Sequence, residues 1–321
     1  MVLTKKGMDV MKRIVMIAAT IVLSFTTIWM TAMAHPSTKT LRLDKNEENK
    51  VDLVPNIKYT KVENVSLKMH LLIPNKHEKP LPLIIFIKGS AWGKIHPQNT
   101  YSFIPQLVPF AKHGYVVASI EHRTSHQAKF PAQLYDVKAA VRYLKSNADK
   151  YHIDPNRVGV WGTSSGAHLA SLLGTTDGIT QLEGTEGNLS QSSTVQAIVD
   201  WYGPTDFLQM SKFPSKVDFN AADSPESKVI GGPLLQNIEK VKRANPITYV
   251  TPDDPPFLIM HGDKDMQVPF NQSELLYEAL KKSGVEADLY KIKGSGHGDG
   301  FSHPKVLQIV QTFFDSHLKT N

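Results

Sequence analysis

Short apolar runs alternate with amphipathic stretches along most of the chain. The runs are bounded by turn residues, as is typical of buried strands, and the stretches between them show helical spacing of apolar residues. Residues 132–150, for example, place Leu134, Val137 and Val141 on one face. Because strands separated by helices form parallel sheets covered on both faces, this pattern predicts an α/β fold. The predicted strands are 83–87, 116–120, 158–161, 195–200, 255–260 and 287–292.

Two regions depart from this alternation. Residues 57–73 hold two stretches of alternating apolar and polar positions, which predict an antiparallel hairpin at the edge of the sheet. Residues 205–251 are rich in proline and glycine and contain only short helical pieces, so we expect a small cap segment there. Three aromatic residues of this segment either line a substrate pocket or only hold the segment against the domain: Phe207, Phe213 and Phe219.

The N-terminal residues have the pattern of an export signal. The basic pair Lys12-Arg13 precedes an apolar stretch that ends in Ala32-Met33-Ala34, a small-residue cleavage pattern. The sequence therefore predicts a signal peptide over residues 1–34, with translation starting at Met1 or Met11. A retained membrane anchor is the alternative, because an apolar stretch of this length could span a bilayer. Either outcome predicts an extracytoplasmic protein, secreted or held at the cell envelope.

Composition limits the remaining possibilities. Residues 35–55 are polar and charged and predict a flexible spacer, which leaves residues 56–321 for one large α/β domain. The chain has no cysteine, which excludes disulfides, thiolate metal ligands and a cysteine nucleophile. The formal net charge is +6, but the basic residues are scattered along the chain and form no block. The charge pattern therefore gives no support for a nucleic-acid partner.

One serine lies at the junction of a predicted strand and a predicted helix. The segment Gly162-Thr163-Ser164-Ser165-Gly166 follows the apolar run 158–161 and begins a small-residue stretch that favours a helix. This is the G-x-S-x-G pattern, in which a sharp turn holds the serine oxygen clear of its own backbone. Since a serine hydroxyl attacks a carbonyl only when a base takes its proton, we predict Ser164 to be a nucleophile paired with a base.

Candidates for the acid and the base follow the serine along the chain, the acid first and then the base. Asp263 and Asp265 come just after the strand 255–260, at the edge of the sheet where open α/β folds bind ligands. The positions of these two aspartates do not decide between them, so both remain candidates for the acid. His297 lies in the glycine-rich loop 294–300, where it has no apolar face to pack against. We therefore predict His297 to be the base.

A tetrahedral intermediate also needs hydrogen-bond donors for its oxyanion. The backbone N–H of Ser165, next to the predicted nucleophile, is one expected donor. The loop after the strand 83–87 reads Lys88-Gly89-Ser90-Ala91-Trp92-Gly93, and its amides at Ser90 and Ala91 are the other expected donors.

Further short motifs support the same interpretation. The supporting segments are 88–92, 121–123, 130–136, 140–144, 153–158, 201–206, 261–269 and 296–298. Together they resemble the α/β-hydrolase superfamily, within it the bacterial feruloyl-esterase-like and hormone-sensitive-lipase-like esterases. The resemblance covers residues 55–320 and implies the α/β-hydrolase fold, a mostly parallel central sheet with helices on both faces and a small cap. In the family pattern H-G-x-x-D-x-x-V-P the acid is the aspartate at the position of Asp265, so the resemblance selects it over Asp263.

Two residues depart from the family pattern H-G-G-x-W. Lys88 stands where the family has histidine, and Ser90 stands where it has the second glycine. Because Ser90 adds a Cβ where the backbone must approach the substrate oxygen, we expect a changed specificity with activity retained. The resemblance also suggests a structural pair of Arg123 and Asp136 beneath this loop. His168, on the helix after Ser164, is expected to be a packed or hydrogen-bonded residue.

The resemblance implies an exported serine carboxylesterase that hydrolyses small to mid-sized acyl esters through an acyl-enzyme. Its expected partner is a small-molecule or polysaccharide-linked ester; no nucleic acid and no membrane contact beyond the leader are expected. No cofactor or metal is expected, because the calcium-loop and H-E-x-x-H patterns are missing around Asp263 and His297. Two alternatives stay open: a serine peptidase like the acylaminoacyl peptidases, and a catalytically silent binding protein on the same scaffold.

Overall fold

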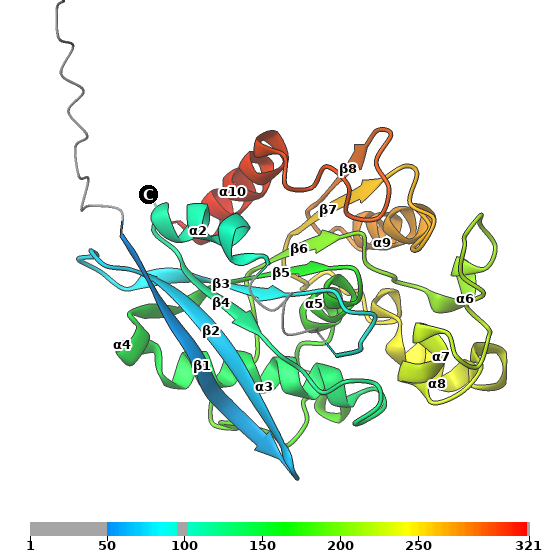
Figure 1. The fold of residues 1–321 in the computed structure, drawn as a ribbon, viewed down its shortest axis with the longest axis horizontal. Helices are drawn as coiled ribbons and strands as arrows, with labels where there is room; N and C mark the ends of the chain where they lie inside the picture. Colours follow the sequence, from blue (N-terminus) through cyan, green and yellow to red (C-terminus); the bar gives the residue numbers. More distant parts are fainter. Residues whose placement is uncertain (1–49, 95–101, 320–321) are drawn as a thin grey trace, which may run out of the picture. The chain divides into compact units, whose positions relative to one another are not determined.

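The structure is a computed structural model and describes residues 50–94 and 102–319. A single central sheet forms the centre of this part of the chain (Figure 1). In these residues eight strands follow the order β1-β2-β4-β3-β5-β6-β7-β8. β2 runs antiparallel to β1 and β4, and all other neighbours pair in parallel. This is the predicted α/β-hydrolase fold. The strands are β1 (Val51–Val62), β2 (Val65–Pro74), β3 (Leu81–Ile87), β4 (Val116–Ile120), β5 (Ile153–Thr163), β6 (Ala197–Trp201), β7 (Phe257–Gly262) and β8 (Ala287–Ile292).

β1 and β2 form the predicted antiparallel hairpin at one edge of the sheet, paired from Val51 with Pro74 to Val62 with Val65. β1 begins at Val51, so residues 51–55 belong to the sheet and the predicted boundary between spacer and domain at residue 55 is wrong. The reason is the position of the strand. An edge strand that faces water keeps a polar sequence, which does not distinguish it from a spacer.

Alternate side chains of each strand enter two separate hydrophobic cores, one on each face of the sheet. In β3, Ile84 and Phe86 pack into the core beneath α2 and α10, whereas Ile85 and Ile87 pack into the core beneath α3, α5 and α9. Figure 1 shows α10 and α2 on one side of the strands and α3 and α5 on the other. The prediction of helices on both faces is therefore confirmed. These helices are α2 (Ile104–Lys112), α3 (Ala132–Ser146), α5 (Ser165–Thr175), α9 (Asn271–Lys282) and α10 (Pro304–Leu318).

The segment predicted as a cap, 205–251, contains only short helices. Phe207 and Phe219 are buried in the core beneath the segment, whereas Phe213 is 45% exposed. The two buried rings therefore hold the segment against the domain, which is one of the two roles expected for these aromatic residues. The α-helices of the segment are α6 (Phe207–Met210), α7 (Pro225–Ile230) and α8 (Ile238–Ala244).

No helix within residues 50–94 and 102–319 is long and apolar enough to cross a bilayer. The predicted signal peptide, residues 1–34, and the spacer up to residue 49 lie outside the described residues.

Candidate active site

Ser164 lies in a sharp turn between β5 and α5. Its backbone has φ 53° and ψ −125°, a combination that residues with a Cβ rarely adopt. A Cβ at Gly162 would lie 2.3 Å from the carbonyl oxygen of Gly166, and one at Gly166 would lie 2.1 Å from that of Ile87. The amide of Ser164 donates to the carbonyl of Trp201 at 2.8 Å, which ties the turn to β6. The turn therefore requires glycine on both sides of the serine.

Three predicted side chains come together at the carboxyl end of the sheet. Ser164 Oγ lies 2.9 Å from His297 Nε2, and His297 Nδ1 lies 2.6 Å from Asp265 Oδ2. Because an ionised carboxylate can only accept, Nδ1 carries the proton and donates it to Asp265. Nε2 is then free to accept the hydroxyl proton of Ser164. The geometry is that of a serine activated by an oriented base.

Asp265 is a buried carboxylate with several donors. Its Oδ1 accepts the backbone N–H groups of Gln267 at 2.8 Å and Val268 at 3.0 Å. Burial raises the pKa of the Asp265 carboxyl, but the hydrogen bonds from His261 and His297 outweigh burial and hold this pKa well below its usual range. The group is therefore charged at neutral pH and fixes the tautomer of the imidazole.

Asp263, the other candidate acid, contacts the loop instead of the imidazole. Its Oδ1 accepts the backbone N–H of Gly294 at 2.6 Å, and the next amide, of Lys264, donates to the carbonyl of Ser295 at 2.9 Å. Both contacts join the loop after β7 to the loop that carries His297. Asp263 therefore holds the histidine loop, and Asp265 holds the histidine.

His261, which was not predicted as a site residue, contacts the same oxygen of Asp265 as His297 does. We call the hydrogen-bonded series Ser164, His297 and Asp265 the relay. His261 is buried, with Nε2 2.9 Å from the carbonyl of Val268 and 3.3 Å from Asp265 Oδ2. Its Nδ1 lies 2.7 Å from Ser273 Oγ. Because the Val268 carbonyl can only accept, Nε2 carries the proton and also faces Asp265 as a donor. The only signal in the sequence was its place at the start of the H-G-x-x-D motif.

Tyr202 is a second unpredicted neighbour. It follows β6 with a left-handed φ of 48°, and its ring lies edge-on to the His297 ring with 4.7 Å between centroids. A second ring neighbour, Phe301, lies 4.6 Å away and is buried. The aromatic contact restricts the imidazole on the side that no hydrogen bond controls.

The predicted oxyanion donors have different environments. The amide of Ser90 donates to Ser165 Oγ at 2.9 Å, so this donor is engaged. Within the described residues, the amides of Ala91 and Ser165 donate to no other group. The left-handed φ values of the loop fall on Ala91 (52°) and Trp92 (51°), and Ser90 has none. The serine at position 90 is therefore tolerated sterically, and its Oγ donates to the carbonyl of Gly93 at 2.9 Å.

A buried chain of hydrogen bonds lies behind this loop. Trp92 Nε1 donates to His168 Nδ1 at 3.2 Å, and His168 Nε2 donates to the carbonyl of Ala244 at 2.7 Å. Burial lowers the pKa of His168 to about 4, so the ring is neutral and can serve as acceptor and donor at once. His168 thus joins the loop after β3 to the cap segment, as expected for a hydrogen-bonded structural residue.

Arg123 and Asp136 form the structural pair suggested by the family resemblance. Arg123 Nε lies 2.9 Å from Asp136 Oδ1, and the backbone N–H of Arg123 donates to Oδ2 at 2.7 Å. A second carboxylate, Glu186, lies 3.1 Å from Arg123 Nη2. These bonds fix the loop after β4 on α3.

Comparison with known proteins identifies the family. The sequence profile of the BD-FAE family matches residues 69–280. The chain belongs to the BD-FAE family. The matched range contains Ser164 and Asp265 and ends before His297. Among the residues that the structure describes, no group of three or more His, Asp or Glu side chains could hold a metal ion.

Similar proteins include esterases. Esterase LipC of Mycobacterium tuberculosis is 33% identical over 223 residues, which are 68% of this chain and 53% of LipC. A solved structure described as a truncated carbohydrate esterase from gut microbiota has a TM-score of 0.77 and 36% identity, over 85% of this chain and 99% of that one. The uncharacterized peptidase YuxL of Bacillus subtilis is 24% identical over 290 residues, 84% of this chain and 40% of YuxL. The chain spans about half the length of the curated relatives it matches first.

Proposed function

We propose that this BD-FAE family member is a serine carboxylesterase that hydrolyses small to mid-sized acyl esters. The observation that carries the proposal is the relay, with 2.9 Å from Ser164 Oγ to His297 Nε2 and 2.6 Å from His297 Nδ1 to Asp265 Oδ2. The similarity to Esterase LipC and to a carbohydrate esterase supports an ester over other acyl compounds.

In the proposed mechanism, Ser164 Oγ attacks the ester carbonyl while His297 Nε2 takes its proton. The charge that develops on the carbonyl oxygen is stabilised by the amide of Ser165 at the start of α5 and the amide of Ala91 in the loop after β3. His297 then gives its proton to the leaving alcohol, which leaves Ser164 acylated. A water molecule, deprotonated by His297, hydrolyses this acyl-enzyme, and Asp265 keeps the imidazole in the productive tautomer in both halves.

The decisive experiment compares wild type with Ser164→Ala on p-nitrophenyl acetate and p-nitrophenyl butyrate. We expect kcat to fall by about 10⁴-fold or more, because the acyl group has no oxygen to bind to. Ser171→Ala, a serine on the same helix α5 that contacts Asp200 at 2.5 Å, serves as the matched control. Equal turnover by wild type and Ser164→Ala would remove the serine from the mechanism.

A peptidase is the second candidate function, favoured by the similarity to the peptidase YuxL. The same relay can cleave an amide, so the substrate decides between the two functions. Release of p-nitroaniline from aminoacyl anilides, with p-nitrophenyl esters left uncleaved, would favour the peptidase. Failure of a fluorophosphonate to label Ser164 in the folded protein would favour a silent binding protein.

Export is a separate part of the proposal, supported by the basic pair and apolar stretch that end at Ala34. The expected result is protein in the extracytoplasmic fraction whose first residue is His35. Full-length protein found in the cytoplasm would contradict export and leave the esterase proposal intact.

A further inference from the structure

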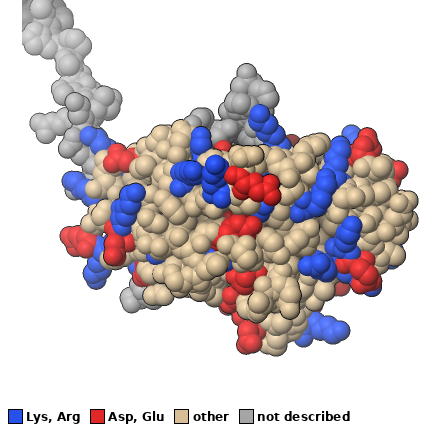
Figure 2. All heavy atoms as spheres, turned by 90° about the horizontal axis from the view of Figure 1, so that it is seen from below, with Lys and Arg blue, Asp and Glu red and all other residues tan. Residues whose placement is uncertain are grey.

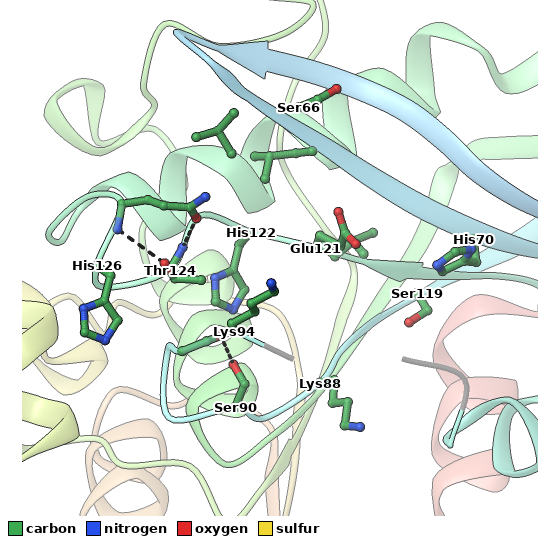
Figure 3. A pocket seen from close by; sticks show the side chains of 15 residues that line it. Ser66, His70, Lys88, Ser90, Lys94, Ser119, Glu121, His122, Thr124 and His126 are labelled. Carbon is green, nitrogen blue, oxygen red and sulfur yellow. Dashed lines mark hydrogen bonds between the residues drawn. The ribbon is translucent and has the colours of Figure 1, made fainter. Parts of the chain in front are cut away.

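A cavity of about 490 Å³ lies beside the loop 88–93, which we call the oxyanion loop. This volume falls in the range of cavities that hold small organic ligands. Its walls come from the start of β2, the end of β4 with the residues that follow, and the oxyanion loop itself (Figure 3). Ser90 belongs to this wall, and its amide contacts Ser165 next to the nucleophile. The cavity is therefore a neighbour of the proposed reaction site.

The wall carries more positive than negative charge. Lys88 and Lys94 line the cavity, and Glu121 is the one carboxylate among its lining residues. Glu121 Oε2 accepts the backbone N–H of Lys68 at 3.1 Å, so the carboxylate is committed to the β2 backbone. Figure 2 shows basic and acidic side chains interspersed over the face it presents. Among the residues that line the cavity, two lysines stand against one carboxylate.

Lys88 has a defined position at the side of the cavity. Its Nζ donates to Ser102 Oγ at 3.0 Å and lies 4.9 Å from the centre of the Phe103 ring. These contacts hold the ammonium group near the start of the oxyanion loop. Gly89, the next residue, approaches the nucleophile so closely that a Cβ there would lie 2.7 Å from Ser164 Cβ. Lys88 therefore lines the cavity and directly precedes the residue whose backbone approaches Ser164.

Neutral polar groups complete the wall. His122 Nδ1 lies 2.9 Å from the carbonyl of Arg123 and must donate to it, so Nε2 is an acceptor. Nε2 is buried and has no hydrogen-bond partner within the described residues. Burial lowers the pKa of His122, which keeps the ring neutral. Hydroxyl groups of four further residues line the same cavity: Ser66, Ser90, Ser119 and Thr124.

We propose that this cavity binds an ionised carboxylate carried by the ester substrate, so that the preferred substrates are hydroxylated acidic esters. Lys88 and Lys94 supply the positive charge, and the hydroxyl groups of the wall can donate hydrogen bonds to the carboxylate oxygens. The inference rests on the proposed esterase function, because the cavity acts on a substrate already bound at Ser164. The carboxylate can belong to the acyl part or to the alcohol part of the ester, and the experiment distinguishes these sources.

The test uses two matched pairs of substrates that differ in one carboxylate. In the acyl pair, the p-nitrophenyl monoester of succinic acid is compared with p-nitrophenyl butyrate. In the alcohol pair, a methyl O-acetylglucuronoside is compared with the corresponding methyl O-acetylxyloside. We expect wild type to prefer the acidic member of one pair by about tenfold in kcat/KM at low salt, falling severalfold at about 0.5 M salt because exposed charges are screened. The pair that shows the preference identifies the source of the carboxylate.

Two variants test the cavity in opposite directions. Lys94→Glu is expected to abolish the preference, whereas Glu121→Gln keeps an oxygen for the Lys68 amide and is expected to increase the preference about threefold. Lys281 is an exposed residue of α9 and does not line the cavity. Lys281→Glu makes the same charge change as Lys94→Glu and should leave the preference for the acidic ester unchanged. A purely structural role of the cavity would not produce a gain for Glu121→Gln.

Two results would overturn this inference while the esterase proposal stands. One is equal kcat/KM for both members of both pairs in a wild type that cleaves p-nitrophenyl acetate. The other is a variant effect that is as large on the neutral esters as on the acidic ones. If wild type cleaves none of the esters, or Ser164→Ala cleaves them equally well, the proposed function itself fails.

Discussion

The relay and the oxyanion loop both lie next to Ser164, but they differ in the groups that they present. The relay consists of side chains, whereas the oxyanion loop presents backbone amides. In the relay, side chains contact side chains, with His297 between Ser164 and Asp265 and with His261 behind. In the oxyanion loop, backbone amides are the proposed donors, and the backbone has left-handed φ values at two consecutive residues, Ala91 and Trp92. We therefore expect the relay to tolerate no change of residue type, and the loop to accept other residues as long as its backbone conformation is kept.

The largest expected effect concerns the relay. Asp265→Asn should lower kcat on p-nitrophenyl acetate by about 10⁴-fold, because an amide no longer fixes the Nδ1–H tautomer of His297. Steady-state rates give the measurement, and circular dichroism shows whether the fold is retained. Asp263→Asn is the matched control, since Asp263 contacts the loop and not the imidazole. Equal losses in both variants would contradict the assignment of Asp265 as the acid.

The second largest effect is expected at the turn that carries Ser164, between the relay and the oxyanion loop. Gly166→Ala should lower the free energy of unfolding by about 3 kcal/mol, because its Cβ would lie 2.1 Å from the Ile87 carbonyl oxygen and nothing flexible can move away. Urea unfolding measures the loss. Gly178→Ala, with φ 72° but open space around its Cβ, isolates the cost of the backbone conformation alone. A smaller loss at Gly166 than at Gly178 would show that the turn relaxes around the added methyl group.

A moderate effect is expected behind the relay. His261→Phe removes a donor to Asp265, so the depressed pKa of this carboxyl rises and the free energy of unfolding falls by about 2 kcal/mol at pH 7. A carboxylate with a depressed folded pKa stabilises the protein above its unfolded pKa, and this contribution disappears as the pH falls through the folded pKa. The difference between variant and wild type should therefore narrow below about pH 4. Urea unfolding of both proteins between pH 7 and about pH 3 measures this difference in the free energy of unfolding. A difference that stays constant over this pH range would contradict the stabilisation of the Asp265 carboxylate by His261.

The smallest effect belongs to the oxyanion loop. Ser165→Ala removes the acceptor of the Ser90 amide and should lower kcat about fivefold, the equivalent of one neutral hydrogen bond of about 1 kcal/mol. Ser90→Gly keeps the amide and should stay within about twofold of wild type. Rates on p-nitrophenyl acetate measure both. If Ser90→Gly lowers kcat more than Ser165→Ala does, the loop is held by the hydroxyl of Ser90 and not by the contact between the Ser90 amide and Ser165.

This contrast also explains how much the sequence could predict. Ser164 stands in a short motif whose glycines are required by close backbone contacts, and His297 is followed by Gly298, which has a left-handed φ of 84°. The positions of Ser164 and His297 therefore follow from residue type and order. Asp265 and Asp263 look alike in the sequence, and only the family pattern selected the residue that contacts His297. The alternation of apolar runs predicted the sheet and the helices on both of its faces.

Features that depend on tertiary contacts could not be predicted in the same way. The role of His261 depends on which carbonyl its Nε2 meets, and the contact between Ser90 and Ser165 joins residues 75 positions apart. The first residues of β1 are polar because the strand lies at the edge, so they were predicted as spacer. In each case the sequence gives the residue, and the neighbour comes from a distant part of the chain.

The chain of bonds from Trp92 through His168 to Ala244 ends on a main-chain carbonyl, which every amino acid possesses. The bond from His168 therefore does not depend on the type of residue at position 244. An insertion or deletion beside position 244 is different, because it would move the carbonyl itself away from His168. We therefore expect this connection between the loop after β3 and the segment 205–251 to survive point substitution at position 244 more readily than a change of length.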